Sequence, residues 1–98
     1  MAQKYPVKIT VYRKFDCDEL PDYSGGCHAF DVGAAFTVKV DGKMPEGFCT
    51  WAWHDLWPVV MTLRFGGEMT YCKQGNMMYS ACSDGLSPVV FKLERIEA

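Results

Sequence analysis

The chain has 98 residues, of which 49% are hydrophobic and 14% aromatic, a composition typical of a globular protein and not of a disordered one. A chain of this length buries roughly 60–68% of its unfolded surface, which predicts one globular domain over residues 1–98. The formal net charge is −2, with 10 basic residues scattered among 12 acids. Because nucleic-acid binding needs clustered Lys and Arg, no nucleic-acid partner is predicted.

The N-terminal segment and the cysteines predict a cytoplasmic protein. Lys4 and Pro6 precede any apolar run, which argues against a secretory signal. The longest apolar stretch, residues 56–63, contains Pro58 and is far shorter than the ~20 residues that cross a bilayer, so no membrane span is predicted. Five cysteines without a close pair favour reduced thiols over a secreted disulfide framework.

The first half of the chain predicts two strands separated by a long loop. Apolar and polar side chains alternate over residues 6–14, which indicates a strand with one buried face. Residues 15–33 are rich in Gly, Asp and Pro and predict a loop, and a loop of this length in a compact domain is often functional. A second strand is predicted from Ala34 to Val40, closing on the turn pair Asp41 and Gly42.

The middle of the chain predicts one helix. Its apolar stripe recurs at alternating steps of four and three: Cys49, Trp53, Leu56, Val60 and Leu63. Thr50 is the predicted N-cap, and the pair Gly66 and Gly67 is predicted to end the helix. Pro58 is expected to kink or split it, because proline removes one backbone hydrogen bond.

The last third predicts a strand at about 77–82, a turn at 83–85 and a strand at about 88–96. The order of elements is therefore strand, strand, helix, strand, strand. This order predicts an α+β fold, in which one kinked helix packs on an antiparallel sheet or half-open barrel of about four strands.

Three segments carry a resemblance that covers nearly the whole chain: GGCHAFDVGAAF, KMPEGFCTWAWHD and CSDGLSPVVFKLERIE. In these segments the chain resembles a family of small, stand-alone, functionally uncharacterised proteins of bacteria and archaea, many of them anaerobes. The resemblance implies a shared fold and no particular activity. His28 stands where that family usually has proline, and Ala81 where it often has another cysteine. The resemblance therefore implies neither a histidine ligand nor a cysteine pair at these positions.

The cysteines raise the question of a metal site. Cys27, Cys49 and Cys82 are candidate ligands for zinc or an iron–sulfur cluster, since thiolates suit both. Four further residues could complete the shell: His28, His54, Cys72 and Cys17. The gaps between the three cysteines lack the C-x-x-C pairs of structural zinc sites, and a buried cysteine commonly serves as a small apolar side chain. No metal or cofactor is therefore expected, with zinc or an iron–sulfur cluster as the alternative.

Cys49 is also the candidate for a reactive thiol. It lies near the predicted helix start, where the partial positive charge of free amide groups lowers thiol pKa values. His54 and Asp55 are the candidate base and orienting acid. Five helical steps of ~100° rotate His54 about 140° from Cys49, so they meet only if Cys49 lies outside the helix. A solvent-facing His54 is the favoured interpretation.

The tryptophans suggest either a core or a docking surface. Trp53 lies on the apolar stripe and is predicted to be core, and burial is also favoured for Trp51 and Trp57, which flank it. Exposed rings would instead indicate a docking surface. Among the charged residues, Asp55 is predicted to be a helix-surface acid, Asp84 a turn former and Glu94–Arg95 a strand-edge pair.

The leading functional hypothesis is a small cytoplasmic binding or accessory protein. It would act through self-association or by docking on a larger protein, using the surface around residues 44–57. The candidate contacts on this surface are Trp51, Trp53, Trp57 and Glu46. The alternative is a thiol-dependent or metal-binding protein that uses Cys27, Cys49 and Cys82.

Overall fold

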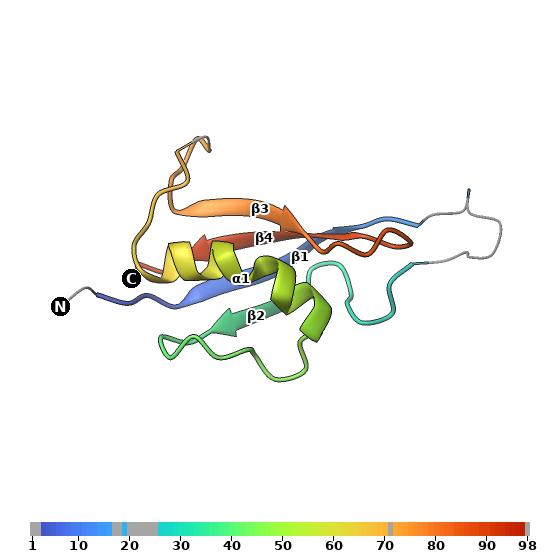
Figure 1. The fold of residues 1–98 in the computed structure, drawn as a ribbon, viewed down its shortest axis with the longest axis horizontal. Coiled ribbons are helices and arrows are strands. Elements are labelled where there is room, and N and C mark those ends of the chain that lie inside the picture. The colour runs from blue at the N-terminus through green and yellow to red at the C-terminus, as the bar shows by residue number, and fades with distance from the viewer. Residues whose placement is uncertain (1–2, 17–18, 20–25, 71, 98) are drawn as a thin grey trace.

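The computed structural model describes residues 3–16, 19, 26–70 and 72–97. Within them the elements are β1 (Val7–Lys14), β2 (Ala35–Val38), α1 (Thr50–Arg64), β3 (Met77–Ala81) and β4 (Val89–Arg95). The strands form one open antiparallel sheet in the order β2-β1-β4-β3, and α1 lies across one face of it (Figure 1). The predicted α+β class and order of elements are confirmed.

The alternation in β1 and β4 produces the two faces of the sheet. Ile9 pairs with Leu93 and Val11 with Phe91, and all four side chains are fully buried beneath α1. A bulge follows Val11, where the register with β4 shifts by one residue. The opposite face carries polar and partly exposed side chains, because successive residues of a strand point to opposite sides.

β2 is shorter than predicted, since it ends at Val38 and leaves Val40 exposed. The carbonyl of Val40 accepts a hydrogen bond from Nε of Arg64 at 2.8 Å, which takes the place of a strand partner. The predicted turn is present: Gly42 has φ of +74° and its amide donates to the carbonyl of Lys39 at 2.9 Å. A Cβ at Gly42 would lie 2.8 Å from the Arg64 guanidinium, so glycine is required there for two reasons.

The helix runs without interruption through Pro58, and its axis bends along its length (Figure 1). Cys49, not the predicted Thr50, is the N-cap residue, and its side chain makes no capping hydrogen bond. The predicted C-terminal end is confirmed. Gly66 has φ of +82°, and the amides of Gly66 and Gly67 donate back to carbonyls of the last turn at 3.1 and 2.7 Å.

An aromatic cluster fills the core beside the start of α1. The ring of Phe48 lies 5.0 Å from both Phe30 and Phe36 and 5.8 Å from Phe91, measured between ring centroids. Phe30 comes from the segment before β2, Phe48 immediately precedes the helix cap and Phe91 is central in β4. The cluster therefore fixes the loop, the helix start and the sheet relative to one another.

The prediction of Glu94–Arg95 as a strand-edge pair is wrong for Arg95. β4 is an inner strand of the sheet, and only 6% of the Arg95 side chain is exposed. Its guanidinium donates to the Gly67 carbonyl at 2.7 Å and to the Glu97 carboxylate at 2.9 Å. The hydrogen bond from Arg95, assisted by one from Asn76, holds the pKa of Glu97 below its ordinary value of 4.5.

Candidate functional site

A small cavity at the N-terminal end of α1 brings three candidate residues together. Cys27 from the loop, Cys49 at the helix cap and Cys82 after β3 all line it, although they lie far apart in the sequence. The cavity has a volume of about 40 Å³. Its remaining lining residues are Phe30, Trp51, Ala52, Asp84 and Val89. The three thiols are free and half-buried.

Backbone amides orient two of the three sulfur atoms. The amide of Val89 donates to Sγ of Cys82 at 3.3 Å, and the amide of Cys82 donates to the Val89 carbonyl at 3.1 Å, so this pair closes the β3–β4 hairpin. In the loop, the amide of Ala29 donates to Sγ of Cys27 at 3.4 Å. Phe30 follows in the aromatic cluster and anchors this end of the loop against the core.

The thiols of Cys27, Cys49 and Cys82 line one cavity but are not arranged as a metal-binding group among the described residues. In the part of the chain that the structure describes, no group of three or more Cys, His, Asp or Glu side chains is placed to hold a metal ion. Cys72 lies elsewhere, with its thiol 3.6 Å from Sδ of Met78. His28 is exposed outside the cavity lining. Cys17 lies outside the described residues.

The proposed partners of Cys49 have different surroundings. His54 faces solvent as predicted, with 89% of its side chain exposed, and its Nδ1 lies 3.8 Å from Oδ1 of Asp55. His54 is not among the residues that line the cysteine cavity. Only 19% of the Asp55 side chain is exposed, so Asp55 is not simply the helix-surface acid predicted from the sequence. Its Oδ2 accepts a hydrogen bond from the Ser83 amide at 2.6 Å.

Ser83 ties the turn after β3 to the first turns of α1. Its hydroxyl accepts a hydrogen bond from Nε1 of Trp51 at 2.6 Å, while its amide donates to Asp55. In the same turn, Asp84 accepts hydrogen bonds from the Leu86 amide and the Ser87 hydroxyl, which confirms Asp84 as a turn former. Ser83 is not among the candidate residues predicted from the sequence, because its only signal there is a place in a turn.

The three tryptophans of α1 differ in exposure and lie on two flanks of the helix. Trp51 is 54% exposed and Trp57 44% exposed, so the favoured prediction of burial is wrong for these two. Trp53 is half-buried and not fully in the core. Its ring centroid lies 6.1 Å from that of Phe48 and 5.6 Å from that of Trp57. An open hollow of about 520 Å³ is lined by Trp53, His54, Trp57 and Pro58.

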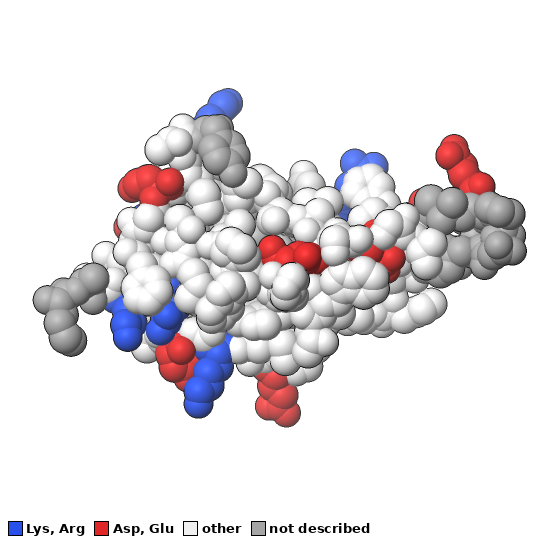
Figure 2. Space-filling view, in the orientation of Figure 1, with Lys and Arg blue, Asp and Glu red and all other residues white. Residues whose placement is uncertain are grey.

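Figure 2 shows this face of the molecule. The surface over α1 is largely uncharged and is interrupted by acidic groups, while Lys and Arg side chains lie toward its edges. Glu46, predicted to share a surface with the tryptophans, lines a different hollow beside Met44 and Lys43. At ~100° per helical residue, Trp57 lies about 40° from Trp53, whereas Trp51 lies about 160° from Trp53, on the other flank of α1. The candidate docking surface is therefore the helix face with Trp53 and Trp57, which we call the tryptophan face.

Comparison of the chain with protein-family models, with curated proteins and with solved structures finds no match. Among the described residues, no helix has the length and apolar character needed to cross a membrane.

Proposed function

We propose that the protein is a small binding or accessory module that docks on an apolar surface of a protein partner through the tryptophan face. The observation that carries this proposal is the exposure of Trp57 beside the hollow of the tryptophan face, on a largely uncharged surface. Tryptophan is enriched at the energetic centres of interfaces, because it supplies a large and rigid apolar area. Exposed apolar patches with polar surroundings are typical of interaction sites.

The rigidity of the tryptophan face supports this function. The ring of Trp53 packs against Phe48 of the core and supports the ring of Trp57 in an edge-on contact. Side chains that are held before binding lose less conformational entropy when a partner arrives. The Trp57 ring and the hollow beside it lie on one face of α1. This arrangement also suits pairing with a second copy of the chain, because a two-fold interface uses the same patch on both subunits.

Replacing Trp57 with alanine is expected to weaken such an interaction at least about 20-fold, the effect of losing an interface hot spot. Phe65→Ala is the matched control, because Phe65 is a similarly exposed aromatic residue just after α1. Size-exclusion chromatography with light scattering measures self-association, and pull-down from a native lysate measures binding to a larger protein. We expect the interaction to survive Phe65→Ala and to be lost with Trp57→Ala.

The docking proposal fails if the wild-type chain is strictly monomeric and recovers no partner. It also fails if Trp57→Ala binds a recovered partner as well as the wild type does, because the interaction would then use another surface.

A second candidate function is a thiol-dependent activity, favoured by the convergence of Cys27, Cys49 and Cys82 on one cavity. Residues that come from three separate segments meet there beside the N-terminus of a helix, a position common for reactive cysteines. Cys49 is the proposed nucleophile, and no metal is required for this function.

The free state of the described cysteines supports a cytoplasmic location, where thiols stay reduced.

This second function requires Cys49 to react with iodoacetamide faster than free cysteine does at neutral pH. Alkylation rates measured by mass spectrometry across a pH series give the comparison. Cys72→Ser is the control, since Cys72 lines a different hollow and its loss should leave the rate at Cys49 unchanged. A Cys49 thiol that reacts no faster than free cysteine removes the thiol function and leaves the docking proposal intact.

A further inference from the structure

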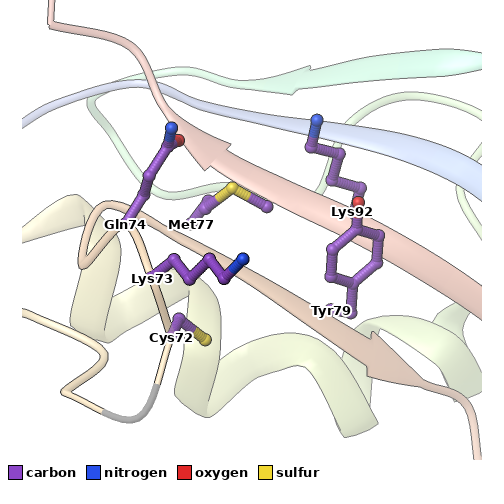
Figure 3. Close-up of a pocket in the computed structure, with 6 residues that line it drawn as sticks. All are labelled: Cys72, Lys73, Gln74, Met77, Tyr79 and Lys92. Atoms are coloured by element: carbon purple, nitrogen blue, oxygen red, sulfur yellow. The ribbon is translucent and has the colours of Figure 1, made fainter.

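A separate hollow of about 450 Å³ lies at the β3 side of the sheet (Figure 3). Its lining residues are Cys72, Lys73, Gln74, Met77, Tyr79 and Lys92. None of these residues lines the cysteine cavity or the tryptophan hollow. The volume falls within the range of about 300–1,000 Å³ that is usual for small-molecule sites.

Sheet register brings the strand residues of this hollow together. Met77 and Tyr79 lie two positions apart in β3 and so belong to the same face of the sheet. Lys92 of β4 lies directly opposite Tyr79 in the antiparallel pairing. The turn before β3 supplies Cys72, Lys73 and Gln74 from the other side, as Figure 3 shows.

The hollow offers a surface for a flat apolar group. The Tyr79 ring is held edge-on against the ring of Tyr12, with centroids 5.0 Å apart and an angle of 72° between the planes. The Tyr79 side chain is nevertheless partly exposed to solvent, and it lines the hollow (Figure 3). Beside it, Met77 contributes a polarisable thioether, which makes favourable contacts with aromatic rings.

The same hollow presents two cationic side chains. Lys73 is exposed, and the structure gives it no carboxylate partner among the described residues. Lys92 lies 3.7 Å from Glu94, and both side chains are partly exposed. An exposed pair of this kind is weak, so an incoming anion can compete with Glu94 for the Lys92 ammonium group. The amide of Gln74 adds a neutral hydrogen-bond donor.

We propose that this hollow binds a small anion that carries a flat apolar ring, an aromatic phosphate or carboxylate. The ring packs against Tyr79 and Met77, and the anionic group lies between the ammonium groups of Lys73 and Lys92. This binding activity is distinct from docking through the tryptophan face, because it uses different residues and a ligand of different chemistry.

Titration of the isotopically labelled protein with phenyl phosphate, followed by NMR, tests this site. We expect saturable shifts at Met77 and Tyr79 with a Kd of about 0.1–1 mM, and weaker binding at high salt. Inorganic phosphate and benzyl alcohol, which each lack one half of the ligand, should bind at least about fivefold more weakly. Benzoate and adenosine monophosphate as further ligands distinguish a carboxylate from a nucleotide source.

Lys73→Met and Lys92→Met should each weaken phenyl phosphate binding about fivefold or more, because each removes one charged donor. Lys43→Met is the matched control, since Lys43 is exposed and lines another hollow. Lys73 lies outside the strands, so its variant tests the site even if Lys92→Met disturbs the sheet. The proposal is overturned if neither phenyl phosphate nor benzoate binds, if inorganic phosphate binds equally well, or if Lys43→Met weakens binding as much as Lys73→Met.

Discussion

Replacing Phe48 with alanine is expected to lower the free energy of unfolding by about 3–5 kcal/mol, the usual cost of truncating a buried phenylalanine. The Phe48 ring is buried and contacts aromatic rings from three segments of the chain. The protein interior is close-packed, so the neighbouring rings cannot fill the space without moving. Chemical denaturation monitored by circular dichroism measures this loss.

The same variant should also open the cysteine cavity. Phe48 adjoins Cys49, and its ring supports Phe30, which anchors the loop that carries Cys27. We therefore expect the thiols of Cys27 and Cys49 to react faster with a thiol reagent in the folded variant than in the folded wild type. Phe65→Ala should change stability by only about 0.5 kcal/mol, because Phe65 is exposed. A loss below about 1.5 kcal/mol for Phe48→Ala, or unchanged thiol rates, would contradict this account of the cluster.

Replacing Arg95 with methionine is expected to lower the free energy of unfolding by about 2–4 kcal/mol at neutral pH. The buried guanidinium donates to the Gly67 carbonyl just beyond α1 and to the Glu97 carboxylate. Methionine occupies a similar length but leaves the carbonyl without this partner. Arg13→Met is the control, since Arg13 is exposed and should have an effect of about 0.5 kcal/mol or less.

The cost of Arg95→Met should depend on pH, because Arg95 holds the pKa of Glu97 below 4.5. A carboxyl group with a lowered pKa in the folded state stabilises the fold above its unfolded pKa. That contribution disappears as the pH falls through its folded pKa. The difference in stability between wild type and variant should therefore be largest above about pH 5 and should narrow below 4.5. A difference that is the same at low and neutral pH would show that Glu97 adds nothing to stability.

The sequence predicted the elements well, because their signals are local. Alternation in residues 6–14 and the pair Gly66 and Gly67 depend on neighbouring residues alone, and both predictions are confirmed. Residues 94–95 show where a local interpretation fails. Adjacent residues of a strand face opposite sides of the sheet, so Arg95 enters the interior while Glu94 pairs with Lys92 on the other face.

The candidate sites were harder to predict, because tertiary contacts create them. No spacing rule indicates that Cys27, Cys49 and Cys82 line one cavity, since the chain reverses direction several times between them. The approach of Lys92 to Tyr79 depends on the register of β3 against β4. On α1, Ala52 takes a fully buried place beside the apolar stripe, which leaves Trp53 half-exposed and Trp51 outside.

Trp51 lines the cysteine cavity and is also exposed to solvent, on the flank of α1 away from the tryptophan face. A partner seated on this indole would cover one wall of the chamber that holds the thiols. Binding of a partner to the Trp51 indole and modification of the thiols in the cavity are then thermodynamically linked. If modification of the thiols changes the partner's affinity by some factor, the bound partner changes the equilibrium constant for that modification by the same factor.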